Sequence, residues 1–84
     1  MTQQNILDVL IVTPERVLFQ GKASDVTLPG EAGVFEVLAH HKPILSLLIG
    51  GDIIVDDTAF AIKRGVAEVM NNRIQAIVEE EANV

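Results

Sequence analysis

Turn-forming Gly, Pro, Asn and Asp residues interrupt this 84-residue chain about every six to twelve positions, and the segments between them are rich in Val, Ile and Leu. This rhythm is typical of an all-β sandwich or barrel. Tight hairpins are expected at Asp56-Asp57 and Asn71-Asn72, because Asp and Asn tolerate left-handed backbone conformations. The sequence therefore predicts an all-β fold, a flattened antiparallel β-sandwich of about nine to ten short strands.

The positions of these turn-forming residues also set the bounds of the expected strands. They are residues 6–12, 16–20, 23–28, 34–38, 44–49, 52–55, 59–63, 66–70 and 74–78. The segment 43–49 has apolar residues at helical spacing as well, but its length is short for a helix and normal for a strand. Residues 1–84 are expected to form one domain with flexible ends at 1–5 and 80–84, since a chain this short cannot support two cores.

Composition excludes several classes of function. A formal net charge of −6 argues against nucleic-acid binding, which needs basic patches to neutralise phosphate. No apolar run approaches the ~20 residues that cross a bilayer, so direct membrane insertion is not expected. The chain has no Cys, and therefore neither disulfides nor a thiolate site.

The candidate chemical groups each have a simpler structural explanation. His40 and His41 are neighbours that would point to opposite faces of a strand, and no third His or Cys completes a zinc site. The spacing of Gly30-Glu31-Ala32-Gly33 is too short for a phosphate-binding loop, and no Lys follows it. Asp56-Asp57 is most simply a solvated turn. We expect no catalytic residue, no metal, no cofactor and no nucleotide.

Two predicted strands are apolar on both faces. Residues 9–12 and 53–55 have no polar position, although a sandwich strand buries only its inner face. Either the chain's own loops and sheet closure cover the second face, or a partner protein covers it. The sequence leaves both alternatives open.

The region from Leu28 to Pro43 contains the most distinctive motif. It combines the residues Pro29, Gly30, Gly33, Phe35, Val37, Leu38, His41 and Pro43. This pattern resembles the β-sandwich domain of the epsilon subunit of F-type ATP synthases, in which Pro29, Gly30 and Gly33 have structural roles in a turn.

The resemblance extends over about residues 6 to 80. It includes the Phe-x-Gly that ends at Gly21 and the late glycine Gly65, which is also assigned a structural role. The chain departs from the family pattern at His40, where Gly is usual, at Lys42, where Ala is usual, and at Lys63-Arg64 beside the late glycine.

The resemblance implies a non-catalytic rotor subunit in the central stalk of a proton- or sodium-translocating ATP synthase. Such a subunit packs against the gamma subunit, sits on the c-ring and couples ion flow to ATP synthesis. The residues that it assigns to these contacts are Glu31, Val34, His40, His41 and Lys42. The expected location is peripheral, on the cytoplasmic face of a bacterial inner membrane or, alternatively, on an organellar inner membrane.

Many epsilon subunits continue into a C-terminal pair of regulatory helices. Only a short acidic segment follows the last expected strand here, so the sequence predicts a subunit that lacks this hairpin and does not inhibit ATP hydrolysis. A small stand-alone β-sandwich binding module is the alternative. Such modules usually display aromatic platforms, and this chain has no Trp or Tyr.

Overall fold

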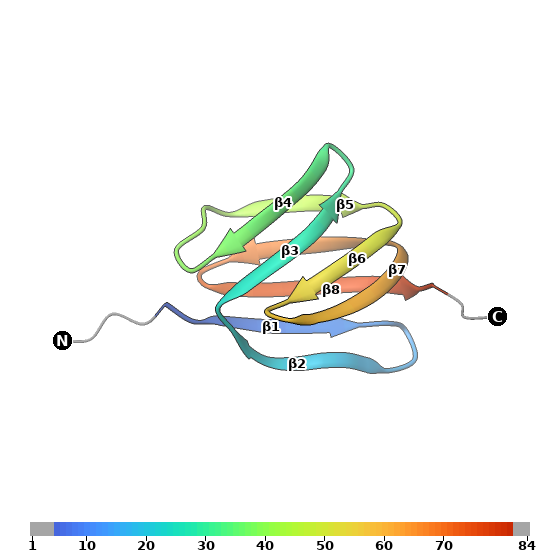
Figure 1. Ribbon diagram of the computed structural model, residues 1–84, viewed down its shortest axis with the longest axis horizontal. Coiled ribbons are helices and arrows are strands. Elements are labelled where there is room, and N and C mark those ends of the chain that lie inside the picture. Colours follow the sequence, from blue (N-terminus) through green and yellow to red (C-terminus); the bar gives the residue numbers. More distant parts are fainter. Residues whose placement is uncertain (1–4, 82–84) are drawn as a thin grey trace.

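The computed structural model describes residues 5–81, which form eight β-strands and no helix (Figure 1). The strands are β1 (Leu7–Val12), β2 (Val17–Ala23), β3 (Asp25–Gly30), β4 (Gly33–Leu38), β5 (Ile44–Leu48), β6 (Gly51–Val55), β7 (Thr58–Met70) and β8 (Arg73–Glu80). This confirms the expected all-β fold, with fewer strands than the nine to ten predicted. Within the described range, no helix is present that is long and apolar enough to span a membrane.

The strands form two layers. One layer, the back sheet, contains β2, β1, β8, the second half of β7, and β5; the other, the front sheet, contains β4, β3, β6 and the first half of β7. Figure 1 shows the front strands running diagonally across the back ones. Pairing is antiparallel except between β1 and β8, which are parallel. The sandwich is therefore mostly, rather than wholly, antiparallel.

Strand β7 belongs to both layers because it contains a bulge. The prediction of separate strands at 59–63 and 66–70 was wrong, since pairing with β8 continues past a register shift between Ile62 and Arg64. Buried positions are even-numbered before this shift, as at Ile62, and odd-numbered after it, as at Val69. An extra residue bends a strand and increases its twist, so β7 can leave one sheet and enter the other.

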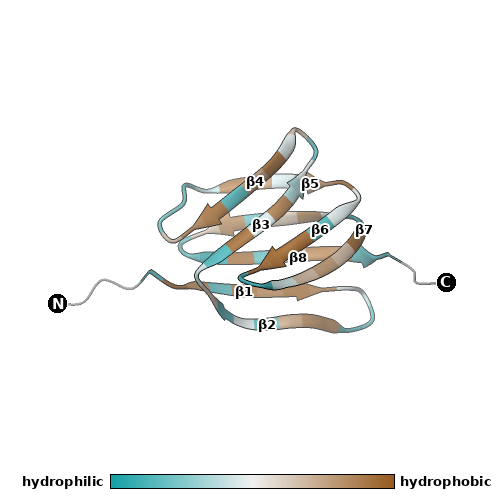
Figure 2. Ribbon diagram, viewed as in Figure 1, coloured by the Kyte–Doolittle hydropathy of each residue, from teal (hydrophilic) through white to brown (hydrophobic). Residues whose placement is uncertain are grey.

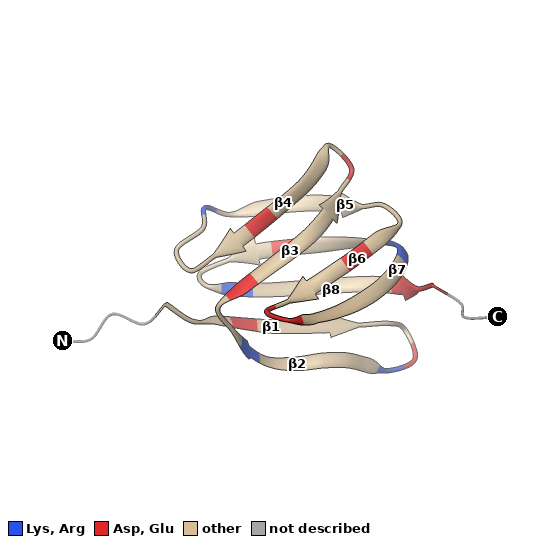
Figure 3. Cartoon of the chain, viewed as in Figure 1, with Lys and Arg blue, Asp and Glu red and all other residues tan. Residues whose placement is uncertain are grey.

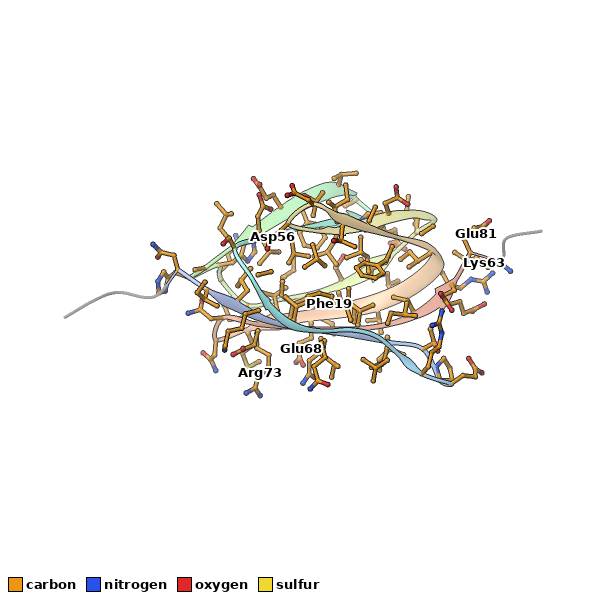
Figure 4. The ribbon with its side chains drawn as sticks, turned by 60° about the horizontal axis from the view of Figure 1, so that its bottom comes forward. Phe19, Asp56, Lys63, Glu68, Arg73 and Glu81 are labelled. Atoms are coloured by element: carbon orange, nitrogen blue, oxygen red, sulfur yellow. The ribbon has the colours of Figure 1, made fainter. Side chains whose placement is uncertain are left out.

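Aliphatic side chains fill the space between the layers. The largest fully buried ones are Leu7, Ile11, Val26, Leu28, Val37, Ile53, Ile62, Val69 and Ile74. They come from alternate positions of six of the eight strands, as expected where one strand face is buried. Burying each such side chain stabilises the fold by about 1.5–3 kcal/mol. Phe19 also lies between the layers, with its ring centroid 5.9 Å from that of Phe60 (Figure 4).

Two hairpins lie where the sequence predicted them. Asp56-Asp57 joins β6 to β7, and Asn71-Asn72 joins β7 to β8. Asp56, Asn71 and Asn72 have positive φ angles of 51°, 53° and 60°. One predicted connection was wrong: Gly21 lies inside β2, and the chain breaks at Ser24 instead.

The ends expected to be flexible, residues 1–5 and 80–84, lie partly outside the residues that the structure describes. Residues 1–4 and 82–84 lie outside the described residues. At the C-terminal side, Glu80 still pairs with Ile62 in the sheet, and the Glu81 N–H donates a hydrogen bond of 3.1 Å to the carbonyl of Ala61.

Candidate functional site

The five residues assigned to partner contacts fall in two separate places. Glu31 and Val34 lie at the β3–β4 turn, whereas His40, His41 and Lys42 lie in the β4–β5 loop. These segments are at opposite ends of β4 (Figure 1). The structure therefore divides the predicted site into two, here named the tip (residues 31–34) and the histidine loop (residues 40–42).

The tip is a two-residue turn whose backbone is fixed to β5. The Glu31 N–H donates to the Leu47 carbonyl at 2.9 Å, and the Ile49 N–H donates to the Pro29 carbonyl at 2.9 Å. Val34 nevertheless is 74% exposed. The tip thus presents an acidic and an apolar side chain on a backbone that is held in place.

Two glycines make this turn possible. Gly30 pairs with Gly33, and a β-carbon at Gly30 would lie 2.8 Å from the Gly33 carbonyl oxygen and 2.8 Å from the Phe35 ring. Gly33 has a φ of 135°, a conformation that side chains rarely allow. A hollow of about 570 Å³ adjoins this turn between β3 and β6.

The histidine loop is held by hydrogen bonds at its start. The His40 N–H donates to Oδ1 of Asn72, and the His41 N–H donates to the Leu38 carbonyl at 3.2 Å. Nδ1 of His41 lies 2.6 Å from the Lys42 carbonyl oxygen, to which it donates when it carries the proton. His40 and Lys42 are exposed and His41 is half-buried. Over residues 5–81, no group of three or more His, Asp or Glu side chains is arranged to hold a metal ion.

The two sheets differ in charge. Strands β3, β4 and β6 carry Asp25, Glu36 and Asp52 but no Lys or Arg (Figure 3). Hydrogen bonding between the Glu36 and Asp25 carboxyl groups, together with their like charges, raises the pKa of Glu36. Strands β3, β4 and β6 therefore form an acidic surface.

The ion pairs of the described chain lie on or beside the back sheet. They are Arg16–Glu80 and Lys22–Asp8, both at 2.7 Å, and Arg64–Glu79 at 3.5 Å. Their side chains are largely exposed, so each contributes little to stability. The hydrogen bond from Lys22 and its positive charge hold the pKa of the Asp8 carboxyl below its usual range.

The predicted contact residues do not include an apolar surface on the outer face of the back sheet. Cross-strand pairing places Leu47, Val66, Ile77 and Val12 in one row. Leu45 and Leu10 lie at the two ends of the adjacent row, with Glu68 and Gln75 between them. We name the six Leu, Val and Ile residues of these rows the apolar strip. Leu45 is 74% exposed, Leu47 58% and Ile77 56%. Figure 2 shows β1 and β5, which contribute four of the six residues, as hydrophobic over most of their length.

For residues 9–12, the sequence left open what covers the second apolar face of the strand, and the apolar strip answers part of this question. Val9 and Ile11 are buried in the core, whereas Leu10 and Val12 point outward and are half-buried. Figure 4 shows Glu68 and Arg73 of the same face directed away from the other layer. Among residues 5–81 no loop covers this face, so the chain's own folding leaves it exposed. β5 is buried on one side, and Leu45 and Leu47 alternate on its other side. This pattern was the signal from which the exposed surface could have been predicted.

A groove connects the apolar strip to the tip. It measures about 550 Å³, and its lining includes Leu47, Val66, Ile77 and Glu31. Exposed apolar surface of this kind, rimmed by polar residues, marks contact sites for other proteins. Fold and site together define a small β-sandwich domain with an exposed apolar surface suited to contact with another protein.

Comparison with known proteins identifies the family. The family described as ATP synthase, Delta/Epsilon chain, beta-sandwich domain matches residues 6–83, and the chain belongs to it. The chain is 33% identical over 85 residues to the ATP synthase epsilon chain of Rickettsia typhi, covering 93% of this chain and 77% of that one. It is 41% identical over 78 residues to the epsilon chain of a Nitratiruptor species, covering 87% of this chain but only 60% of that relative.

A solved structure has the same fold. It is described as the central stalk/c-ring of the Tetrahymena thermophila mitochondrial ATP synthase, determined by cryo-electron microscopy. The TM-score is 0.73 at 16% identity, over 88% of this chain and 63% of that one. The resemblance to ATP synthase epsilon subunits is thus confirmed, and the chain is a non-catalytic subunit of that family.

Proposed function

We propose that this chain is a rotor subunit in the central stalk of an F-type ATP synthase. In this role it joins the gamma subunit to the c-ring and couples proton or sodium flow to ATP synthesis. The observation that carries the proposal is the family match over residues 6–83, nearly the whole chain. The stalk and ring named for the structurally similar chain support it. A linking subunit needs two contact surfaces, and the tip and the apolar strip are two candidates.

The apolar strip fits the gamma subunit. A rotor subunit stays attached to its neighbour while torque passes between them, and permanent interfaces are more hydrophobic than transient ones. Leu45, Leu47 and Ile77 are each more than half exposed, so a partner gains hydrophobic burial there. The histidine loop leads directly into β5, the strand of Leu45 and Leu47, so we assign it to the same contact.

The tip fits the c-ring. Cytoplasmic loops of membrane proteins carry an excess of Lys and Arg, and Glu31 presents an exposed carboxylate to such loops. Charge complementarity of this kind fixes orientation between partners. The same charge argument supports our proposal that the chain is peripheral, on the cytoplasmic face of a bacterial inner membrane or, alternatively, on an organellar inner membrane.

Binding to gamma tests the proposal. Ile77→Gln replaces an apolar side chain of the strip, and Ile54→Gln makes the same change on the outer face of the front sheet, where Ile54 is 37% exposed. We expect Ile77→Gln to weaken binding to gamma by roughly tenfold or more, equivalent to at least about 1.4 kcal/mol. Ile54→Gln should bind like the parent chain.

Two outcomes would count against these assignments. Equal binding by the Ile77→Gln and Ile54→Gln variants would show that the apolar strip is not the gamma-binding surface. Failure of the parent chain to bind either gamma or the c-ring would overturn the proposed function and favour the stand-alone binding module.

A further inference from the structure

His40 has a backbone conformation that is uncommon for residues other than Gly. Its φ angle is 69°, in the left-handed region that Gly enters freely and that other residues seldom occupy. The resemblance noted above places Gly at this position in related chains. Residues in such conformations persist only where the surrounding structure holds them, and they cluster at binding sites. The structure therefore needs a feature that stabilises His40.

Asn72 supplies that feature. Its side-chain oxygen Oδ1 accepts a hydrogen bond from the His40 N–H, and its backbone carbonyl accepts one of 2.9 Å from the Asp8 N–H. Asn72 itself has a φ of 60° in the turn between β7 and β8. One residue thus connects the histidine loop, the start of β1 and the β7–β8 turn.

The other hydrogen bonds of the histidine loop are local. The His41 N–H returns to the Leu38 carbonyl at the end of β4, and the His41 ring contacts the neighbouring Lys42 carbonyl. These contacts shape the loop but do not attach it to the back sheet. The hydrogen bond from His40 to Asn72 does, because Asn72 lies between two strands of that sheet.

We propose that Asn72 is a positioning residue that holds the histidine loop in the conformation that binds gamma. This inference rests on the proposed function. The loop leads directly into β5, which carries Leu45 and Leu47, so its attachment fixes the geometry between His40 and the apolar strip. A loop that is already ordered loses less conformational entropy on binding. Asn72 acts through the loop, and needs no contact with the partner.

Three variants separate this role from general effects on the turn. Asn72→Gly removes the side-chain acceptor but permits the left-handed backbone. Asn72→Asp keeps an oxygen acceptor and also tolerates that backbone. Asn71→Gly is the matched control, since Asn71 occupies the same turn with a φ of 53° and makes no hydrogen bond to the histidine loop.

Hydrogen exchange of the His40 amide measures the attachment without any partner. We expect Asn72→Gly to speed this exchange by roughly tenfold or more, because the loop opens locally once its acceptor is lost. Asn72→Asp and Asn71→Gly should stay within about twofold of the parent chain. Unchanged exchange in Asn72→Gly would overturn the attachment of the loop by Asn72.

Binding to the gamma subunit then measures the consequence. We expect Asn72→Gly to weaken binding by roughly fivefold or more through lost pre-organisation, and Asn72→Asp to restore it. Faster exchange with unchanged binding in Asn72→Gly would overturn the positioning role. A parent chain that did not bind gamma would overturn the proposed function, and the exchange measurement would still decide whether Asn72 holds the loop.

Discussion

Gly65 on β7 pairs with Val78 on β8 so closely that no side chain fits between the strands. A β-carbon at Gly65 would lie 2.6 Å from the carbonyl oxygen of Ile77 and 2.7 Å from Cγ1 of Val78. The first of these is a backbone atom, so a rotamer change cannot relieve the overlap. The close approach comes directly after the bulge through which β7 changes sheets.

Gly65→Ala is therefore expected to destabilise the fold by about 1–3 kcal/mol, the usual effect of overpacking. Gly21→Ala is the control, because a β-carbon at Gly21, also within a strand, would meet only the Phe19 ring at 3.4 Å. Its effect should stay below about 1 kcal/mol. Denaturant unfolding of the two variants measures the difference, and equal midpoints would contradict this account.

The sequence predicts the class of fold because the turn residues and the apolar alternation both indicate the same short strands. Turn residues mark the strand ends, and alternation identifies the buried face, as at Ile74, Ala76 and Val78. The bulge in β7 was misinterpreted as a break between Lys63 and Val66, where Arg64 and Gly65 interrupt the apolar pattern. The change from even to odd buried positions was the signal of a continuous, bent strand.

Other features depend on contacts between distant segments. The parallel pairing of β1 with β8 joins residues at the two ends of the chain, and no local pattern specifies it. The separation of Glu31 from His40 likewise follows from the length and direction of β4. The motif placed all five predicted contact residues within one stretch of sequence, but a strand between them sends them to opposite ends.

Asp8 and Glu36 are expected to affect stability with opposite signs. Lys22 lowers the pKa of Asp8 in the folded state, so its contribution is present above the unfolded value of 3.8 and is lost as pH falls through the folded pKa. Asp25 raises the pKa of Glu36 in the folded state above the unfolded value of 4.5. The contribution of Glu36 to stability is therefore present below that value and is lost as pH rises through the folded pKa.

At neutral pH, Asp8→Asn should therefore lower the thermal midpoint slightly, and Glu36→Gln should raise it slightly. Both carboxyl groups are exposed, so both effects should be small and should decrease in high salt. The differences from the parent chain should shrink as pH falls below the ordinary carboxyl range. Thermal unfolding at neutral and acidic pH checks this, and shifts of the same sign in both variants would refute it.

His40→Gly is expected to increase stability. Left-handed backbone costs a residue other than Gly about 1–2 kcal/mol, whereas the greater freedom of Gly in the unfolded chain offsets about 0.4–1 kcal/mol of that gain. The net increase in the free energy of unfolding should be about 0.5–1 kcal/mol. His40→Ala keeps the strain and removes the imidazole, so it should unfold like the parent. Equal stability of the two variants would show that His40 is not strained.

The tip and the histidine loop lie apart, so we expect that a substitution in one can weaken binding to its partner without affecting binding at the other. Glu31→Lys reverses a charge at the tip, and Lys42→Glu reverses one in the loop, at the other end of β4. Both side chains are exposed, so neither change should shift the free energy of unfolding by more than about 0.5 kcal/mol. Unfolding midpoints provide the control for folding.

Binding of each variant to the isolated c-ring and to gamma then assigns the surfaces. Glu31→Lys should weaken c-ring binding by roughly tenfold, because it places a positive charge against the basic loops proposed for the ring, and should leave gamma binding within about twofold. Lys42→Glu should have the reverse effect, because its loop adjoins the face assigned to gamma. If both variants weakened both partners equally while folding normally, tip and loop would belong to one continuous interface, and the assignment of two surfaces to two partners would be wrong.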